Sequence, residues 1–204
     1  MKSAVNTKGL SLVIQAGGES LRMGQNKALL PFRGQPLVQR LIERLGPAAE
    51  ETIVTTNQPD AFAGFGVRLA GDLLPGLGAL SGLYTALHAA RCPLVAVVAC
   101  DMPFASPLLL AHQAALLADS AWAAVVPRSD QGLEPFHAVY RREICLPLVE
   151  AALQAEKRRV DAWFAGAKIY FLLPEETRLY DPAGLAFINV NTPAEFAEAE
   201  ALET

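Results

Sequence analysis

A glycine-rich loop followed by two cations gives this sequence its clearest chemistry. The apolar run Leu10 to Ile14 has the composition of a buried strand, and Gly17, Gly18, Arg22 and Lys27 follow it. Without a Cβ, glycine lets phosphate oxygens approach backbone N–H groups. Arginine binds phosphate through parallel N–H groups, and lysine acts as a compact charge. We predict a site for a chain of phosphates; the plainer interpretation is a tight turn with two solvated cations.

A carboxylate follows the clearest buried strand of the sequence. Asp101 stands just beyond the run Leu94 to Ala99 and before Met102-Pro103. Carboxylate oxygens suit Mg²⁺, which commonly bridges to phosphate oxygens. The same position also suits an aspartate that only forms a turn or caps a helix. We favour a metal ligand, because Asp101 and the Gly17 loop fall on the same edge of the expected sheet.

At these residues the chain resembles the nucleotidyltransferases related to molybdenum cofactor guanylyltransferase. The pattern A-G-G-x-S-x-R-M-G-x-x-K at residues 16–27 is similar to that family's N-terminal signature, and C-D-M-P at 100–103 is similar to its metal-binding motif. Gln15 and Asn26 depart from the usual Leu and Asp. The resemblance implies Mg²⁺ as cofactor, Asp101 as its ligand, and catalytic roles for Arg22, Lys27 and Asp101.

The resemblance also implies contacts to a nucleotide. Asn57 and Asp72 follow expected strands, where each could equally be an ordinary turn former. A second glycine-rich loop, residues 76–82, opens a helix and resembles a base and ribose contact, although a flexible connection has the same composition. Its small residues lean towards guanine. The nucleotide-binding residues expected in this way are Ala16, Gly17, Gly18, Lys27, Asn57, Asp72, Gly78, Leu80, Gly82 and Asp101.

Two further segments resemble the acceptor side of the family. The pattern F-I-N-V-N-T-P at 187–193 places Asn189 and Asn191 two residues apart, so they face the same side of an extended chain. The pattern E-P-F-H-A at 134–138 adds Glu134 and His137, although His137 is equally well explained as a plain surface or core histidine. We expect Glu134, His137, Asn189 and Asn191 to bind the acceptor.

Strand-like runs alternate with helical patterns along most of the chain. This alternation predicts an α/β fold, in which a mostly parallel sheet has helices on both faces in three layers. The resemblance implies a Rossmann-like nucleotidyltransferase fold. We expect residues 1–204 to form one domain, with an acceptor-side lobe around 130–181, where the pattern is less regular. We expect an edge-type strand at 136–140 and a last helix capped by Thr192 and Glu195. The other expected strands are 10–14, 52–56, 67–70, 94–99, 123–126 and 169–173, and the other helices are 37–45, 80–90, 107–117 and 144–155.

Composition excludes several classes of protein. The 204 residues are 52% hydrophobic and 19% charged, with a formal net charge of −4, which indicates a compact chain with no nucleic acid as partner. No apolar run reaches the length of a membrane span, and no secretory leader is visible. Cys92, Cys100 and Cys145 are widely spaced, as in a reducing compartment. We therefore expect a cytoplasmic protein without a membrane partner.

These observations converge on nucleotidyl transfer. The expected reaction moves GMP from GTP to the phosphate of a molybdopterin-type cofactor and releases pyrophosphate, with Mg²⁺. The alternatives are a cytidylyltransferase on the same cofactor, a sugar- or polyol-phosphate nucleotidyltransferase, and a non-enzymatic nucleotide- or cofactor-delivery module. Beyond its substrates, we expect only transient contact with cofactor-biosynthesis or acceptor enzymes. A dinucleotide-dependent oxidoreductase fits least, because G-x-G-x-x-G is absent.

Overall fold

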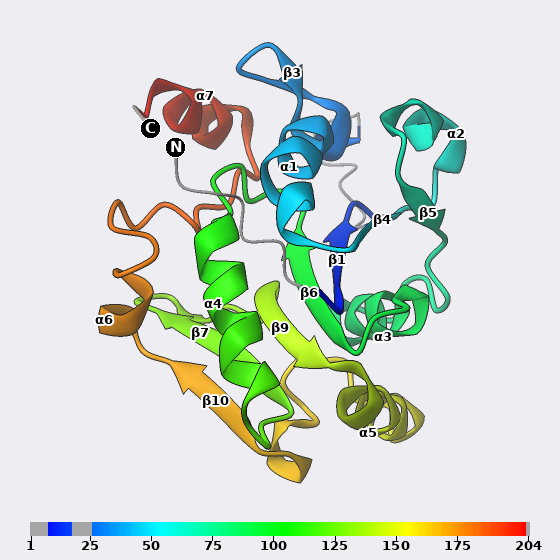
Figure 1. Ribbon diagram of the computed structural model, residues 1–204. Coiled ribbons are helices and arrows are strands. Elements are labelled where there is room, and N and C mark those ends of the chain that lie inside the picture. The colour runs from blue at the N-terminus through cyan, green and yellow to red at the C-terminus, as the bar shows by residue number, and fades with distance from the viewer. Residues whose placement is uncertain (1–7, 18–25, 203–204) are drawn as a thin grey trace.

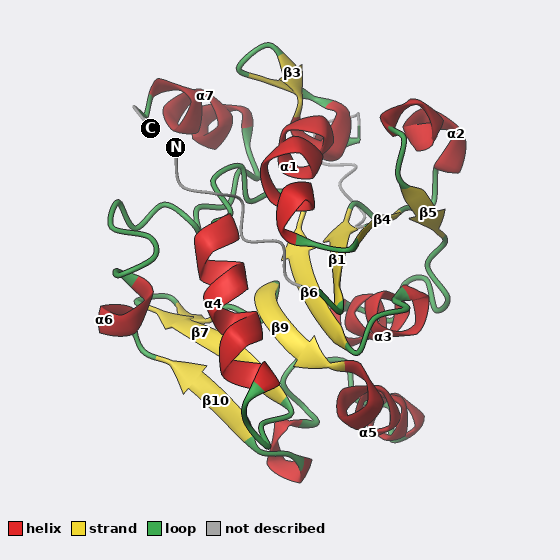
Figure 2. Cartoon of the chain, viewed as in Figure 1, coloured by secondary structure: helices red, strands yellow, loops and turns green. Residues whose placement is uncertain are grey.

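The computed structural model describes residues 8–17 and 26–202. Within them, eight strands form one mixed sheet in the order β10-β7-β9-β6-β1-β4-β5, with β8 paired to β7 (Figures 1 and 2). The strands are β1 Leu10–Gln15, β4 Glu51–Thr55, β5 Arg68–Ala70, β6 Leu94–Ala99, β7 Ala124–Ser129, β8 Gly132–Leu133, β9 His137–Arg141 and β10 Ile169–Leu172; β2 Pro31–Phe32 and β3 Gln35–Pro36 form a separate hairpin. The longer helices are α1 Leu37–Leu45, α3 Ala79–Ala89, α4 Pro107–Ala118, α5 Arg142–Gln154 and α7 Pro193–Ala201. The shorter ones are η2 Lys27–Leu29, η3 Gly46–Ala48, α2 Pro59–Phe62, η4 Ala63–Phe65, η5 Phe164–Gly166 and α6 Pro174–Thr177.

Alternate side chains of β1 enter two separate cores. Leu12 and Ile14 pack with α1 and α4 on one face, whereas Val13 packs with α3 and α5 on the other. Figure 1 shows α4 crossing in front of β7 and β9, with α1 above it on the same side of the sheet. Because a strand buried on both faces needs apolar residues at every position, the continuous run in β1 follows from this architecture. The three-layer α/β fold expected from the sequence is confirmed.

The strand around residue 137 was predicted at a sheet edge, and that prediction is wrong. Strand β9 lies between β6 and β7, antiparallel to both, and its residues 137–140 are fully buried. Its polar side chains make hydrogen bonds inside the protein, although His137 Nδ1 is buried with no partner among the described residues. The Ser106 N–H donates to His137 Nε2 (3.0 Å), and the Tyr140 hydroxyl donates to the Pro135 carbonyl (2.6 Å).

The range 130–181, expected as a less regular lobe, contributes strands β8, β9 and β10 to the same sheet as β1. It also contributes α5, which packs beside α3 and helps to bury the second core. Between α5 and β10 the chain runs through turns and η5. The strands of this range are therefore continuous with the main sheet. No helix among the described residues is long and apolar enough to cross a membrane.

The chain reverses its winding direction beside β1. Strand β1 pairs in parallel with β4 on one side and β6 on the other, so Gln15 stands opposite both Thr55 and Ala99. Helix α1 connects β1 to β4 and covers one face of the sheet. Helix α3 connects β5 to β6 and covers the opposite face. Such a reversal opens a crevice beyond the carboxyl ends of the strands, where α/β proteins bind ligands. Because β9 runs antiparallel, its start at residue 137 reaches the same edge.

Candidate active site

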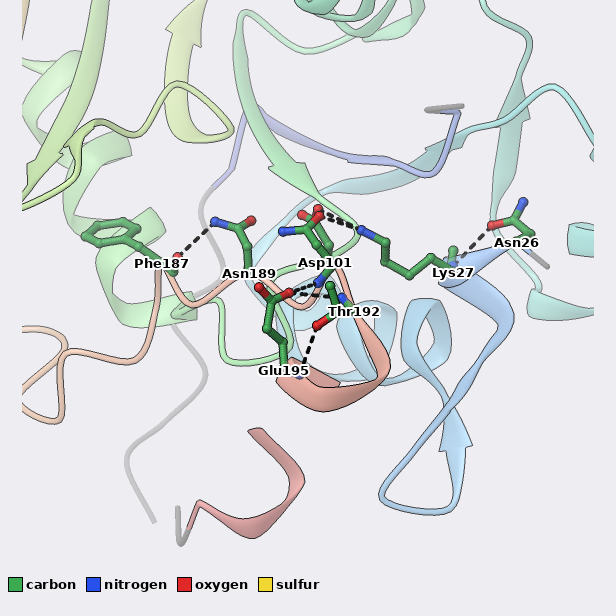
Figure 3. A network of polar contacts seen from close by, with 9 residues as sticks. Asn26, Lys27, Asp101, Phe187, Asn189, Thr192 and Glu195 are labelled. Carbon is green, nitrogen blue, oxygen red and sulfur yellow. Dashed lines mark hydrogen bonds and ion pairs between the residues drawn. The ribbon is translucent and has the colours of Figure 1, made fainter. Parts of the chain in front are cut away.

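A buried lysine joins three distant parts of the chain. Lys27 Nζ donates to Asn191 Oδ1 (2.8 Å) and to Asp101 Oδ2 (3.3 Å), as Figure 3 shows. The Lys27 side chain is 8% exposed and that of Asp101 is 22% exposed. Removing an ammonium from water is costly unless oxygens replace its hydration, which these two side chains do. The charge is therefore held at a defined position beyond β1 and β6.

The short helix η2 fixes the backbone of Lys27. Asn26 is its N-cap, and its side-chain Oδ1 accepts the Ala28 N–H (3.1 Å). The other end of the same amide donates through Nδ2 to Gln58 Oε1 (3.2 Å). An aspartate at residue 26 would accept the same N–H but could not donate to Gln58. The departure from the family pattern at residue 26 thus keeps the cap and adds a bond to the segment after β4.

The second carboxylate oxygen of Asp101 is free to bind a ligand. Asp101 Oδ1 is buried and has no hydrogen-bond partner among the described residues. The described residues contain no group of three or more His, Cys, Asp or Glu side chains that could hold a metal ion. A carboxylate oxygen of this kind fits a hard cation that takes its remaining ligands from phosphate oxygens and water.

A cavity of about 400 Å³ opens beside Asp101, between the strand ends and the start of α3. Several expected site residues line it, namely Gly17, Asp72, Gly78, Gly82 and Asp101. Others that line it were not singled out as site residues from the sequence: Gln15, Thr55, Gly76, Ala79, Ser81, Thr85, Ala99, Cys100 and Phe136. The neighbouring ends of β1, β4, β5 and β6 bring these residues together, as expected for the carboxyl edge of a parallel sheet.

Glycines shape the wall that α3 contributes. Gly78, the N-cap of α3, has φ +85°, a backbone conformation that favours glycine. At Gly82, a Cβ would lie 3.2 Å from Gln15 Oε1, so glycine lets the Gln15 amide rest against the helix. The Nε2 of that amide is buried without a partner among the described residues. Gln15, the second departure from the family pattern, therefore presents a free donor group at the cavity.

A polar network shapes the loop between β5 and α3. The Asp72 N–H donates to Asn57 Oδ1 (3.2 Å), and Asp72 Oδ1 accepts from the Leu74 N–H (3.1 Å) and the Thr85 hydroxyl (3.0 Å). Thr85 is buried and also accepts the Leu73 N–H (3.1 Å). Asn57 and Asp72 thus act together as turn-forming residues, and Asp72 also lines the cavity. A threonine in the second turn of an apolar helix gave no signal in the sequence.

Two expected nucleotide contacts face elsewhere. The Leu80 side chain is fully buried in the core beneath α3, and its N–H donates to the Arg158 carbonyl (3.2 Å). Ala16 is buried, and its N–H donates to the Thr55 carbonyl (2.9 Å). Both residues support the cavity wall and do not line it. The expected residues Gly18 and Arg22 lie outside the described residues.

The four expected acceptor residues separate into two pairs. Asn191 binds Lys27, and Figure 3 shows Asn189 close to Asp101, with its Nδ2 donating to the Phe187 carbonyl (3.1 Å). The structure does not bring Glu134 or His137 into the cavity lining. Glu134 accepts a hydrogen bond from the Ser129 hydroxyl (2.6 Å), and burial raises the pKa of its carboxyl.

Burial also decides the state of His137. Desolvation lowers the pKa of its imidazole to about 4, so the ring is neutral near pH 7 and its Nε2 accepts the Ser106 N–H. The ring packs edge-on against Phe187. Of the alternatives open for this residue, the structure favours a core histidine, and the adjacent Phe136 lines the cavity instead.

Comparison with known proteins gives consistent results. The family model described as the MobA-like NTP transferase domain matches residues 12–168. A probable molybdenum cofactor guanylyltransferase from Pelotomaculum thermopropionicum is 34% identical over 190 residues, covering 93% of this chain and 91% of the relative. Another from Carboxydothermus hydrogenoformans is 33% identical over 195 residues, covering 93% of this chain and 94% of the relative.

Solved structures share the fold. The molybdopterin-guanine dinucleotide biosynthesis protein A of Archaeoglobus fulgidus superposes with a TM-score of 0.82 at 24% identity, covering 93% of this chain and 96% of the other. The 2-C-methyl-D-erythritol 4-phosphate cytidylyltransferase of Thermus thermophilus superposes with a TM-score of 0.68 at 20% identity, covering 94% and 97%. At these identities the likeness concerns the fold.

Proposed function

Because the chain belongs to the MobA-like NTP transferase family and is therefore a nucleotidyltransferase, we propose that it transfers GMP from GTP to a molybdopterin-type cofactor. Pyrophosphate is the leaving group, and a phosphate of the cofactor is the nucleophile. The observation that carries the proposal is the buried Lys27 ammonium, which Asp101 and Asn191 hold beside the cavity. The names of the relatives support guanylyl transfer in particular.

The reaction asks the protein mainly for positioning and for positive charge. In-line attack on the α-phosphorus breaks its bond to the bridging oxygen, and negative charge grows on the departing pyrophosphate. The held ammonium of Lys27 is a compact charge for those oxygens, since its position is fixed before substrate arrives. Gly17 lines the cavity nearby and leaves room for a phosphate group. No covalent intermediate on the protein is required.

Magnesium dependence is part of this proposal. The unpaired, buried Oδ1 of Asp101 fits the ion, and phosphate oxygens of the substrates would complete its shell. When bound there, Mg²⁺ would supply positive charge that offsets the negative charge of the reacting phosphates. Asp101 would hold the ion while Lys27 keeps its contact with the other carboxylate oxygen.

The wall formed by α3 is our candidate for the base and ribose site. Gly78 and Gly82 leave space there, while Gln15 offers an unpaired Nε2–H donor that can bind the O6 acceptor of guanine. Asn189, which lies close to Asp101 in Figure 3 and does not line this cavity, is our candidate for the acceptor side. We also propose a cytoplasmic location, which the three free cysteines support.

Pyrophosphate release with each of the four nucleoside triphosphates, with and without the pterin cofactor, tests this function. We expect magnesium-dependent release with GTP only when the cofactor is present. Preference for CTP would replace guanylyl by cytidylyl transfer. Binding of GTP without release in the presence of cofactor and magnesium would indicate a delivery module instead.

A further inference from the structure

We propose that Glu195 is a positioning residue for the active-site lysine, acting through Asn191, so that helix α7 forms part of the phosphate-binding machinery. The inference rests on the proposed function of Lys27, but the contacts that support it are independent of the nucleotide. Lys27 and Glu195 lie at opposite ends of the chain, and the contacts between them run through Asn191. Figure 3 labels the two ends of this connection, Lys27 and Glu195.

The first link is the carboxylate of Glu195. Its Oε2 accepts two backbone N–H groups, from Asn191 (2.6 Å) and from Thr192 (2.9 Å). A capping box requires only the bond to the N-cap residue, here Thr192, whose hydroxyl in turn accepts the Glu195 N–H (3.2 Å). The bond to Asn191 is therefore additional to helix capping, and it fixes the residue that binds the lysine.

The second link is the contact between Asn191 and Lys27. At 2.8 Å it is shorter than the 3.3 Å contact between Lys27 Nζ and Asp101 Oδ2. Because the ammonium is almost fully buried, losing the asparagine oxygen would leave it with one long contact among the described residues. The position of Asn191 therefore controls whether the charge stays at its place beside Asp101.

The segment that carries Asn191 is fixed on both sides. The Val190 N–H donates to the Asp101 carbonyl (2.9 Å), and the Val190 side chain is fully buried. Val190 shares a small core with Phe196 of α7 and with Phe32 and Phe104. Asn191 thus lies between Val190, which is fixed in the core, and helix α7. The Glu195 side chain accepts the Asn191 backbone N–H and so fixes its position.

The alternative is that Glu195 only caps α7, and Thr192→Ala separates the two roles. This variant removes the hydroxyl half of the capping box but keeps the carboxylate that holds Asn191. Glu195→Ala removes the carboxylate half of the box together with the contact with Asn191, and it keeps the Thr192 hydroxyl cap. Glu198→Ala is a second control, because Glu198 is exposed on the same helix and makes no hydrogen bond or ion pair with the described residues.

The experiment measures transfer kinetics together with the Lys27 side-chain ammonium signal in ¹H–¹⁵N spectra of lysine-labelled protein, assigned with Lys27→Arg. We expect a signal protected from solvent exchange in the wild type, in Thr192→Ala and in Glu198→Ala, and its loss in Glu195→Ala and Asn191→Ala. We expect kcat/KM to fall roughly 10- to 100-fold in Glu195→Ala, the scale of a misplaced catalytic group, and to stay within about twofold in both controls.

Two results would overturn the inference. One is a protected Lys27 signal in folded Glu195→Ala; the other is an equal loss of kcat/KM in Thr192→Ala and Glu195→Ala. If Glu195→Ala does not fold, Glu195→Gln decides. Its amide oxygen can still cap α7, but it accepts the Asn191 N–H less strongly than a carboxylate does, so kcat/KM must fall below that of Thr192→Ala. A wild type without transfer would refute the proposed function alone, since the Lys27 signal still decides this inference.

Discussion

At the scale of single residues, the site contains buried polar atoms, of which some have hydrogen-bond partners and others have none. Lys27 Nζ has two oxygen partners, whereas Gln15 Nε2 and Asp101 Oδ1 have none among the described residues. Buried groups without partners destabilise a protein unless a ligand satisfies them. Two of these atoms belong to residues that line the same cavity, which is what a binding site requires.

Replacing Gln15 by methionine tests whether its amide serves a ligand. Methionine has a similar length and no amide, so the unpaired donor disappears at little cost in volume. We expect an equal or higher melting temperature and GTP affinity weakened roughly 10-fold, the loss of about one hydrogen bond. Thermal denaturation and titration calorimetry measure the two effects. A melting temperature lower by several degrees with unchanged affinity would show that the amide is structural.

His137 predicts a pH dependence of stability. Burial lowers the pKa of its imidazole from 6.5 to about 4 in the folded protein. Below pH 6.5 His137 binds a proton in the unfolded chain but stays neutral in the folded protein. Its contribution to the free energy of unfolding is therefore complete above pH 6.5 and is lost as pH falls towards 4. Between pH 7 and pH 5 the loss is about 2 kcal/mol.

The matched variant for this prediction is His137→Gln, which offers an oxygen to the Ser106 N–H but does not titrate. Denaturant unfolding at pH 7 and pH 5 compares the two proteins. We expect the wild type to lose more free energy of unfolding than the variant over this interval. Equal losses would mean that the buried imidazole takes no part.

At the scale of elements, the prediction agrees with the structure where one physical rule dominates. Continuous apolar runs gave β1 and β6 almost to the residue, and Thr192 with Glu195 marked the start of α7. Strand β9 was misplaced because its alternating pattern also fits an edge strand. Its place between β6 and β7 depends on long-range strand pairing that no local pattern reveals. The two-residue strands β2, β3 and β8 are too short to produce a period.

Helix η2 carries a prediction of its own, because its cap sets the position of Lys27. In Asn26→Ala the Ala28 N–H loses its acceptor, at a cost of about 1 kcal/mol, and we expect kcat/KM to fall roughly 10-fold. Asn26→Asp keeps the acceptor and should stay within about threefold of the wild type in steady-state kinetics. If Asn26→Ala matched the wild type, or Asn26→Asp lost as much as Asn26→Ala, the cap would have no role in holding the lysine.

At the scale of the whole molecule, the site forms where the winding of the sheet reverses. The sequence predicted that the ends of β1, β4, β5 and β6 meet at one edge, and the structure brings Gly17, Asp72 and Asp101 to one cavity there. It did not predict that Asn191 would bind Lys27, because that contact spans 164 positions and depends on how α7 packs. Nor did it place Leu80 in the core, since a helix start in a glycine-rich loop does not reveal which side chains turn inwards.

The central claim is that Lys27, Asp101 and Asn191 direct nucleotidyl transfer from GTP. Transfer of label from GTP carrying ³²P at the α-position tests this claim most directly. The wild type, with magnesium and the pterin cofactor, should move the label into the cofactor. Asp101→Asn, which keeps the size of the side chain and an oxygen for Lys27, should fold and lower the rate at least about 100-fold. Magnesium-dependent label transfer at the wild-type rate in folded Asp101→Asn would contradict the account.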